Sequence, residues 1–115
     1  MQDTIGFDRG DIVLVAFVFA DERGVKRRPA LILSCQAYHR RRDEAILAAI
    51  TSNTQRLFFG DTLVEAWANA GLLFPSVVTG VVRTIKREMI LRRLGALSPL
   101  EMHAVERRLR LSLAL

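Results

Sequence analysis

Two residues of this chain could act together on a phosphate group, Arg28 and Thr51. Arg28 lies just before the apolar segment 30–35, and Thr51 directly follows the apolar segment 45–50. If these segments form neighbouring antiparallel strands, the start of one lies beside the end of the other. The guanidinium could then bind a phosphate through two parallel N–H bonds, and the hydroxyl could add a third hydrogen bond. The competing interpretation is an arginine in solvent and a threonine that closes a strand.

The charge of the chain favours a polyanionic partner such as nucleic acid. The formal net charge is +5 at pH 7 on 115 residues, and the pI is about 10.6. Only Lys26 and Lys86 are lysines among the 17 basic residues, so the others are arginines. A guanidinium matches phosphate oxygens with a planar fork and also stacks on bases. A GC-rich genome, which favours arginine codons, is the alternative explanation.

Length and composition indicate one domain, residues 1–115, of an ordinary globular protein. Hydrophobic residues make up 50% and charged residues 25% of the chain, as in typical soluble domains. The apolar runs fall short of the roughly 20 residues that cross a bilayer. The first eleven residues, MQDTIGFDRGD, are acidic and polar, unlike a secretory signal. We therefore expect a cytoplasmic protein with no membrane association.

The remaining residues with chemical potential are one cysteine and two histidines. Cys35 ends an apolar run, so we expect a small buried residue, with a reactive thiol as the alternative. His39 precedes three arginines at 40–42, which predicts an exposed loop histidine whose pKa is lowered by like charge; an acid/base role is the alternative. His103 falls in the C-terminal segment, at the surface or in packing. This set is too small for a zinc site, and no metal or cofactor motif occurs.

Hydrophobic patterning predicts a mainly β fold with a helix at the C-terminus. Strands are expected at residues 10–20, 30–35, 45–50, 76–82 and 89–97. Residues 21–28 are expected to form a charged loop and residues 36–44 a polar connection. The segment 63–76 should hold one helical turn closed by Gly71, with Trp67 as a packing residue. Together these elements indicate a small, strongly bent β-barrel or sheet capped by a helix.

The segment from residue 98 onward is the clearest helix prediction. Ser98 suits the N-cap, Pro99 the first helical position and Glu101 the reciprocal position of a capping box. A single apolar stripe follows, formed by Met102, Val105, Leu109 and Leu113. Basic residues in the later half complement the negative end of the helix dipole, namely Arg107, Arg108 and Arg110.

Four segments together resemble the MazF/PemK family of toxins from bacterial type II toxin–antitoxin systems. They are RGDIVLVAF, KRRPALILS, AAITSN and PSVVTGVVRTIKREMILRRLGALSP, in that order. The resemblance runs from Arg9 to the terminal helix. It implies a small SH3-like β-barrel, MazF/CcdB-like, with a C-terminal α-helix and a homodimeric assembly. It also implies sequence-specific cleavage of single-stranded mRNA without a metal, which leaves 2′,3′-cyclic phosphate and 5′-hydroxyl ends and inhibits translation and growth.

The resemblance also implies roles for individual residues. The family's essential arginine before a proline corresponds to Arg28, and its essential threonine to Thr51. Lys26 and Arg27 are then expected to hold the RNA strand that leads to Arg28. The flanking loops, 18–27 and 52–60, would supply base contacts. Their candidate residues are Phe19, Ser52 and Asn53, with Phe58 or Phe59 able to stack on bases or, alternatively, packed in the core.

The chemistry expected of this pair is electrostatic. RNA carries its own nucleophile, the 2′-hydroxyl, so the protein must align it and stabilise the charge of the phosphorane. Arg28 suits that stabilising role and could also donate a proton to the leaving oxygen, but a permanently protonated group is a poor base. Thr51 would orient a non-bridging oxygen, and no compelling base is evident. Two positions depart from the family pattern, Ala16 in place of an acidic residue and Thr79 in place of a basic one.

A MazE-like antitoxin with an acidic, disordered segment is the partner that the resemblance implies. The alternative to an RNA endonuclease is a non-catalytic barrel, either a plain nucleic-acid-binding module or a gyrase poison like CcdB. CcdB relies on a C-terminal Trp-Gly-Ile ending, whereas this chain ends in LSLAL, which disfavours the gyrase poison.

Overall fold

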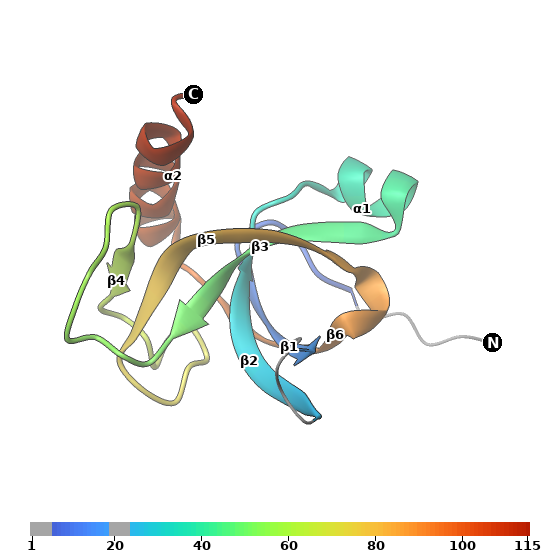
Figure 1. The fold of residues 1–115 in the computed structure, drawn as a ribbon, viewed down its shortest axis with the longest axis horizontal. Coiled ribbons are helices and arrows are strands. Elements are labelled where there is room, and N and C mark those ends of the chain that lie inside the picture. Colours follow the sequence, from blue (N-terminus) through green and yellow to red (C-terminus); the bar gives the residue numbers. More distant parts are fainter. Residues whose placement is uncertain (1–5, 19–23) are drawn as a thin grey trace.

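A computed structural model describes residues 6–18 and 24–115 of the chain. The described part contains six strands, two α-helices and one short 3-10 helix (Figure 1). The strands are β1 (Asp11–Val18), β2 (Val25–Ile32), β3 (Glu44–Thr51), β4 (Thr62–Val64), β5 (Ser76–Lys86) and β6 (Ile90–Ala96). The helices are α1 (Gln36–Arg42), η1 (Arg87–Met89) and α2 (Pro99–Leu113). The predicted fold class, mainly β with a C-terminal helix, is confirmed.

The strands form one antiparallel sheet in the order β4-β5-β3-β2-β1-β6. The sheet curls into a half-barrel, with α2 beside β4 and β5 and α1 at the other end (Figure 1). Register shifts interrupt the β1–β6 and β3–β5 ladders, and such bulges increase local twist and bend. The order places the start of β2 beside the end of β3, as the sequence predicts for Arg28 and Thr51.

Two glycines let the two ends of the curled sheet meet. A Cβ atom on Gly95 of β6 would lie 2.1 Å from the carbonyl oxygen of Ala70, in the turns that follow β4. A Cβ atom on Gly71, whose φ is +89°, would lie 2.1 Å from the carbonyl oxygen of Leu94. Neither position can carry a side chain without moving backbone. The contact between these two segments therefore closes the side of the half-barrel that the sheet leaves open.

Each face of the sheet carries its own core, because apolar residues occupy both alternating sets of positions. Ile12 and Leu31 belong to a cluster that includes Val105 and Leu109 of α2. The opposite face packs a second cluster, whose members include Val13, Val15, Ala30, Ile32, Leu47 and Ile85. A strand buried on both faces is a continuous apolar run in the sequence. For this reason the sequence predicts the strands around residues 10–20 and 30–35.

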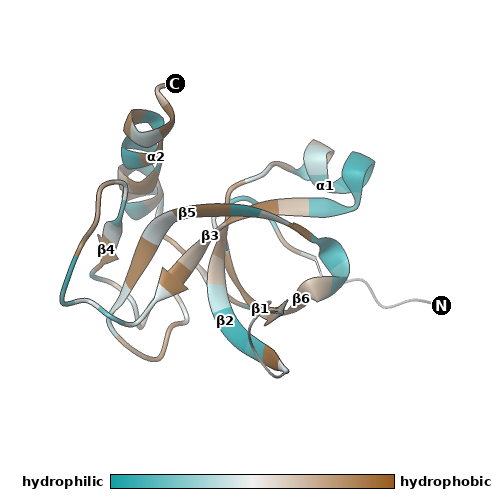
Figure 2. Cartoon of the chain, in the orientation of Figure 1, coloured by the Kyte–Doolittle hydropathy of each residue, from teal (hydrophilic) through white to brown (hydrophobic). Residues whose placement is uncertain are grey.

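The structure corrects two of the predicted connections. Residues 25–28 are not loop but the first half of β2, which is hydrophilic in Figure 2 after the apolar Val25 at its tip. They are extended because β1 pairs with them as far as Val18 opposite Val25. The connection predicted at 36–44 is mainly helix α1, which a local pattern of seven residues did not reveal.

The segment after Thr51 holds a strand that the sequence did not predict. β4 has only three residues, too few for a periodic signal, and pairs with β5. Hydrogen-bonded turns follow it up to Gly71, as predicted, and Trp67 packs partly buried against the core. No helix among the described residues is long and apolar enough to cross a membrane.

The C-terminal helix is confirmed, with two differences from its predicted details. The Ser98 hydroxyl accepts the backbone N–H of Glu101 at 3.2 Å. The Glu101 carboxylate, however, accepts the backbone N–H groups of Glu65 and Ala66 at 3.0 and 3.2 Å. It therefore ties the helix to the turn after β4. Leu113, expected in the apolar stripe, is 56% exposed, because the last turn of α2 extends past the core.

Asp61 is a buried carboxylate that holds the loop before β4. Its two oxygens accept the backbone N–H groups of Phe58 and Gly80, each at 2.9 Å. We expect Asp61→Ala to lower the free energy of unfolding by about 2–3 kcal/mol, because two N–H groups lose a charged acceptor. Urea unfolding measures the change. Glu88→Ala, at an exposed carboxylate, is the control, and equal stability of the two variants would contradict this role.

Candidate nucleic-acid interface and active site

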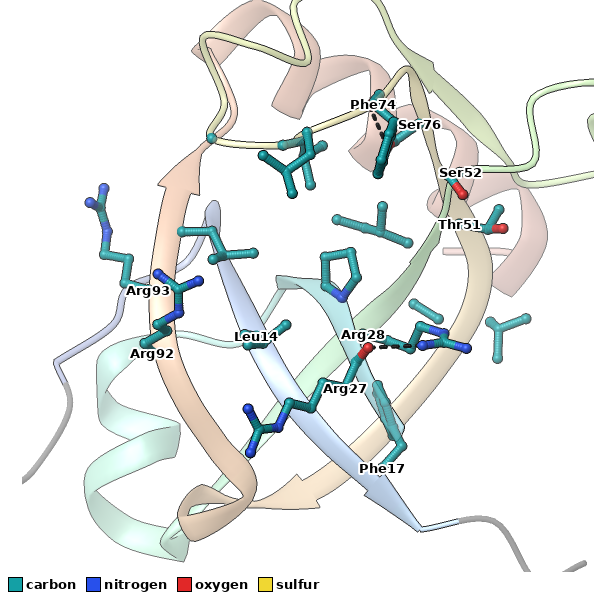
Figure 3. Close-up of a pocket in the computed structure, with 18 of the residues that line it drawn as sticks. Leu14, Phe17, Arg27, Arg28, Thr51, Ser52, Phe74, Ser76, Arg92 and Arg93 are labelled. Carbon is teal, nitrogen blue, oxygen red and sulfur yellow. Dashed lines mark hydrogen bonds between the residues drawn. The ribbon is translucent and has the colours of Figure 1, made fainter. Parts of the chain in front are cut away.

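A cavity of about 850 Å³ opens where the start of β2, the end of β3 and β6 come together. Its floor is apolar, with Leu14 and Pro29 among the lining residues. Its polar lining is largely arginine, as Figure 3 shows for Arg27, Arg28 and Arg92. No aspartate, glutamate or histidine lines the cavity among residues 6–18 and 24–115. The cavity is thus suited to an anion that also carries apolar surface.

The structure brings Arg28 and Thr51 to the same cavity. β2 and β3 pair antiparallel with Ala30 opposite Ala49, and two further steps in this register reach Arg28 and Thr51. Figure 3 shows both side chains on the same side of the cavity. The prediction that their strands are neighbours is confirmed.

Local hydrogen bonds orient both groups. Arg28 is exposed, and its Nη1 donates to the carbonyl oxygen of Arg27 at 2.9 Å. The Thr51 hydroxyl accepts the backbone N–H of Asn53 at 3.1 Å. Since that bond uses a lone pair of the oxygen, the hydroxyl hydrogen can still be donated to a ligand. The guanidinium keeps further N–H groups for the same purpose.

The other predicted RNA-binding residues are distributed unevenly. Arg27 and Ser52 line the cavity. Lys26 is exposed on β2 but is not among the lining residues. Asn53 is also outside the lining, and its side-chain oxygen accepts the backbone N–H of Gln55 at 3.2 Å. Phe19 lies outside the described residues.

Phe58 and Phe59 lie away from this cavity. They are 62% and 80% exposed, so they are not core residues. Both line a smaller hollow against α2, together with Arg107 and Arg108. The guanidinium carbon of Arg56 lies 5.0 Å from the ring centre of Phe58, which already covers one face of that ring.

The sequence did not point to the β6 side of the cavity. Arg92 and Arg93 both line it, and the only signal was a pair of arginines within a predicted strand. Phe74 also lines it and is 62% exposed. The Ser76 hydroxyl donates to the Phe74 carbonyl oxygen at 2.8 Å, which fixes the loop before β5. No local pattern marks Phe74 as a cavity residue.

Ala16 and Thr79, the two departures from the family pattern, lie within the sheet and outside the cavity lining. Ala16 is half-buried on β1, opposite Arg27 in the register. Thr79 lies where the β3–β5 register shifts, and its hydroxyl donates to the carbonyl oxygen of Ala49 at 2.7 Å. The same hydroxyl accepts the backbone N–H of Val81 at 3.2 Å. Thr79 therefore secures the bulge rather than lining the cavity.

His39 is buried, contrary to the prediction of an exposed loop residue. Its ring is 1% exposed, and Nε2 lies 2.6 Å from the Ser34 hydroxyl. The ring of Phe7 packs on it with ring centres 4.5 Å apart. Burial, and then the charge of Arg87, lower the pKa of His39, while Asp8 opposes this shift. The error arose because the short helix α1 turns this residue inward.

The buried imidazole makes stability depend on pH. A pKa lowered in the folded state means that the unfolded chain binds the proton more readily. The contribution of His39 is therefore complete above its unfolded pKa of about 6.5 and is lost as the pH falls toward the folded pKa. We expect a steeper loss of unfolding free energy below pH 6.5 in the wild type than in His39→Gln. Urea titrations from pH 5 to 8 measure it, with His103→Gln as the exposed control.

Cys35 also differs from its prediction, because it is exposed rather than buried. It occupies the N-cap position of α1, and the backbone N–H of Tyr38 lowers the pKa of its thiol. His103 is exposed, with Nδ1 3.4 Å from a carboxylate oxygen of Glu106. In the part of the chain that the structure describes, no group of three or more acidic, histidine or cysteine side chains could hold a metal ion.

Comparisons with solved structures show the same fold elsewhere. Mycobacterium tuberculosis toxin MazF-mt6 superposes with a TM-score of 0.75 at 26% identity, covering 91% of this chain and 97% of the other. A MazE-MazF structure from Deinococcus radiodurans gives 0.77 at 24% identity, covering 98% and 99%. A mycobacterial endoribonuclease in complex with its cognate antitoxin gives 0.75 at 20% identity, covering 96% and 97%.

A comparison with curated proteins finds no match. The model of one protein family, in contrast, matches residues 8–113, which include the whole curled sheet, both sides of the arginine-lined cavity and α2. The chain therefore belongs to the PemK-like, MazF-like toxins of type II toxin–antitoxin systems.

Proposed function

We propose that this protein is an endoribonuclease toxin that cuts single-stranded mRNA in the arginine-lined cavity. The observation that carries this function is the presence of Arg28 and Thr51 on one cavity wall, at the adjoining ends of β2 and β3. Further support comes from family membership and from relatives described as endoribonucleases. Arrest of translation and growth is the expected consequence in a cell.

The proposed reaction is an internal transfer within the RNA. The 2′-oxygen attacks the adjacent phosphorus, a 2′-O–P bond forms, and the P–O5′ bond breaks. The 2′-hydroxyl loses its proton and the 5′-oxygen gains one, so the products are a 2′,3′-cyclic phosphate and a 5′-hydroxyl. No redox partner is needed, and the nucleophile belongs to the substrate.

The side chains divide the remaining work. Arg28 stabilises the negative charge that develops on the phosphorane oxygens, because its fork can donate two N–H bonds to them. Thr51 donates its hydroxyl hydrogen to a non-bridging oxygen and so fixes the phosphate for attack. Protonation of the leaving 5′-oxygen is a second role open to Arg28. The described lining offers no carboxylate or imidazole as a base for the 2′-hydroxyl.

The decisive experiment incubates the purified protein with a long single-stranded RNA in EDTA and maps the ends of the products. Discrete cuts with cyclic phosphate and 5′-hydroxyl ends are expected. RNA binding without cuts would instead identify a non-catalytic barrel. Cutting that requires a divalent cation would contradict the metal-independent route.

Thr51 allows a nearly isosteric test. Thr51→Val keeps the shape and the β-branched backbone preference but removes the hydroxyl, so we expect kcat to fall by about 100-fold, as for loss of one donor to a developing charge. Thr51→Ser retains the donor and should keep most of the activity. Cleavage of one fluorogenic RNA measures both variants, and equal rates for Thr51→Val and the wild type would remove Thr51 from the reaction.

We also propose that a MazE-like antitoxin restrains this toxin and that the toxin is a homodimer. MazE-MazF structures from Deinococcus radiodurans share its fold, and its arginine-rich cavity suits an acidic, extended segment. Exposed apolar side chains on α2, among them Leu111 and Leu113, could be covered by a second copy. Light scattering should give twice the mass of the chain, and the purified cognate antitoxin should suppress the cuts.

A further inference from the structure

The cavity has a second basic wall that the proposed reaction does not use. Leu14 of β1 pairs with Pro29 on one side and with Arg92 of β6 on the other. Residues directly opposite in antiparallel strands project to the same face of the sheet. All three line the cavity, so an apolar floor separates Arg92 from the wall that carries Arg28 and Thr51 (Figure 3).

The spacing across this floor suits a nucleotide chain. Strands lie about 4.8 Å apart, so the backbones at Arg92 and Pro29 are separated by about 10 Å. Arg27 pairs with Ala16, which is two residues beyond Leu14 on β1. It is therefore offset from Arg92 by two strand spacings and two residues, about 12 Å between the backbones, a span that two extended arginine side chains can bridge around one phosphate. Both guanidiniums border the same floor.

The arginines on either side of Leu14 differ in whether an acidic side chain balances their charge. The Nε of Arg93 lies 3.2 Å from a carboxylate oxygen of Asp11, so that charge is balanced. Neither Arg92 nor Arg27 forms a salt bridge with the described residues, and both side chains are exposed. Two like charges that border the same cavity repel each other, although water weakens the repulsion between exposed groups. A bound phosphate would relieve that repulsion and accept forked N–H bonds from both residues.

We propose that Arg92 and Arg27 bind a second phosphate of the RNA, adjacent to the scissile one, with the intervening nucleoside over Leu14 and Pro29. This inference rests on the proposed function, because it assumes that an RNA strand enters the cavity. It extends that function by giving the RNA a path through the cavity, which crosses the sheet from β3 towards β6. It also makes Arg92 a residue that positions substrate and not one that acts on the reacting atoms.

The first test measures binding of a 2′-O-methyl RNA, which cannot be cut, at several salt concentrations. Each phosphate contact in a single-stranded complex contributes about 0.7 to the slope of log K against log salt concentration. Arg92→Gln should weaken binding about tenfold and reduce the slope by about 0.7. Arg41→Gln removes an equal charge from the exposed surface of α1 and should leave the slope unchanged. Equal slopes for Arg92→Gln and the wild type would overturn the inference.

The second test combines the protein variant with a change in the RNA. The cut position is first mapped with wild-type protein, and each neighbouring phosphate of the 2′-O-methyl RNA is then replaced by an uncharged methylphosphonate. At the phosphate held by Arg92 and Arg27, the methylphosphonate should cost at least about tenfold, and adding Arg92→Gln should cost nothing further. At the scissile phosphate the two losses should multiply.

The outcomes distinguish failure of the second phosphate position from failure of the proposed nuclease function. Cutting by the wild type with multiplying losses at every phosphate would reject the second phosphate position and leave the nuclease intact. If the wild type leaves the long single-stranded RNA uncut, both are rejected. Arg92→Lys adds a further check, because a point charge should restore the salt slope more fully than the affinity.

Discussion

Arg28→Ala should lower the rate of RNA cleavage by about a thousandfold, equivalent to roughly 4 kcal/mol of transition-state stabilisation. The guanidinium is exposed, and among the described residues its one hydrogen bond goes to the carbonyl oxygen of Arg27. Its removal should therefore take away the proposed donor to the phosphorane charge and little of the packing. Single-turnover cleavage with saturating protein isolates the chemical step from RNA binding.

The controls for Arg28 distinguish chemistry from charge and from folding. Arg28→Lys keeps the charge but not the fork, so we expect an intermediate rate. Arg41→Ala removes a charge from α1 and should cut at the wild-type rate. The thermal midpoint of Arg28→Ala should stay within a few degrees of the wild type. A folded Arg28→Ala protein that cuts normally would end the proposal of a role for Arg28.

The second large effect is expected on stability, at the contact that closes the half-barrel. A methyl group on Gly95 would lie 2.1 Å from the Ala70 carbonyl oxygen, which is backbone and cannot rotate away. We expect Gly95→Ala to lower the free energy of unfolding by about 3 kcal/mol, at the upper end of the usual cost of overpacking. Denaturant unfolding followed by tryptophan fluorescence suits this measurement, because Trp67 lies in the turns that contact β6.

Gly6→Ala is the matched control for Gly95. A Cβ atom at Gly6 meets nothing within 4 Å, and its φ is not in the left-handed region. That variant should be as stable as the wild type. If Gly95→Ala were equally stable, the turns after β4 would have to move away from β6 at little cost. The cavity would then lose its wall near Gly71 and Leu94, which RNA binding would detect.

Much of the sheet could be predicted because its strands are buried on both faces and leave unbroken apolar runs. Two such runs suggested the pairing of β2 with β3 only as a condition for Arg28 to meet Thr51; the family resemblance implied that the pair acts together, and the register confirms that the two strands are neighbours. Loop assignments were less reliable. Lys26, Arg27 and Arg28 are charged and would be solvated alone, but residues 15–18 of β1 pair with residues 25–28. Long-range pairing overrode local composition there.

The features that sequence reasoning missed depend on contacts between distant segments. Asp61 looks like an ordinary turn residue, yet its carboxylate holds Gly80, 19 positions away. Gly95 looks like a weak point in a strand until the Ala70 carbonyl is placed against it. Burial of His39 follows from the direction of a single short helix. Arg92 reads as a surface arginine because nothing local indicates which side of β6 meets the cavity.

The pairing of the first strand with the last has a consequence for how the toxin is made. β1 joins β6 through residues near positions 11–15 and 90–96. A ribosome must therefore translate most of the message before β1 can acquire this neighbour, and such distant pairing forms slowly. A nascent chain that stops short of β6 also lacks one basic wall of the cavity. Under the proposed function, a nascent chain without β6 therefore lacks Arg92 and cannot yet hold the second phosphate in this cavity.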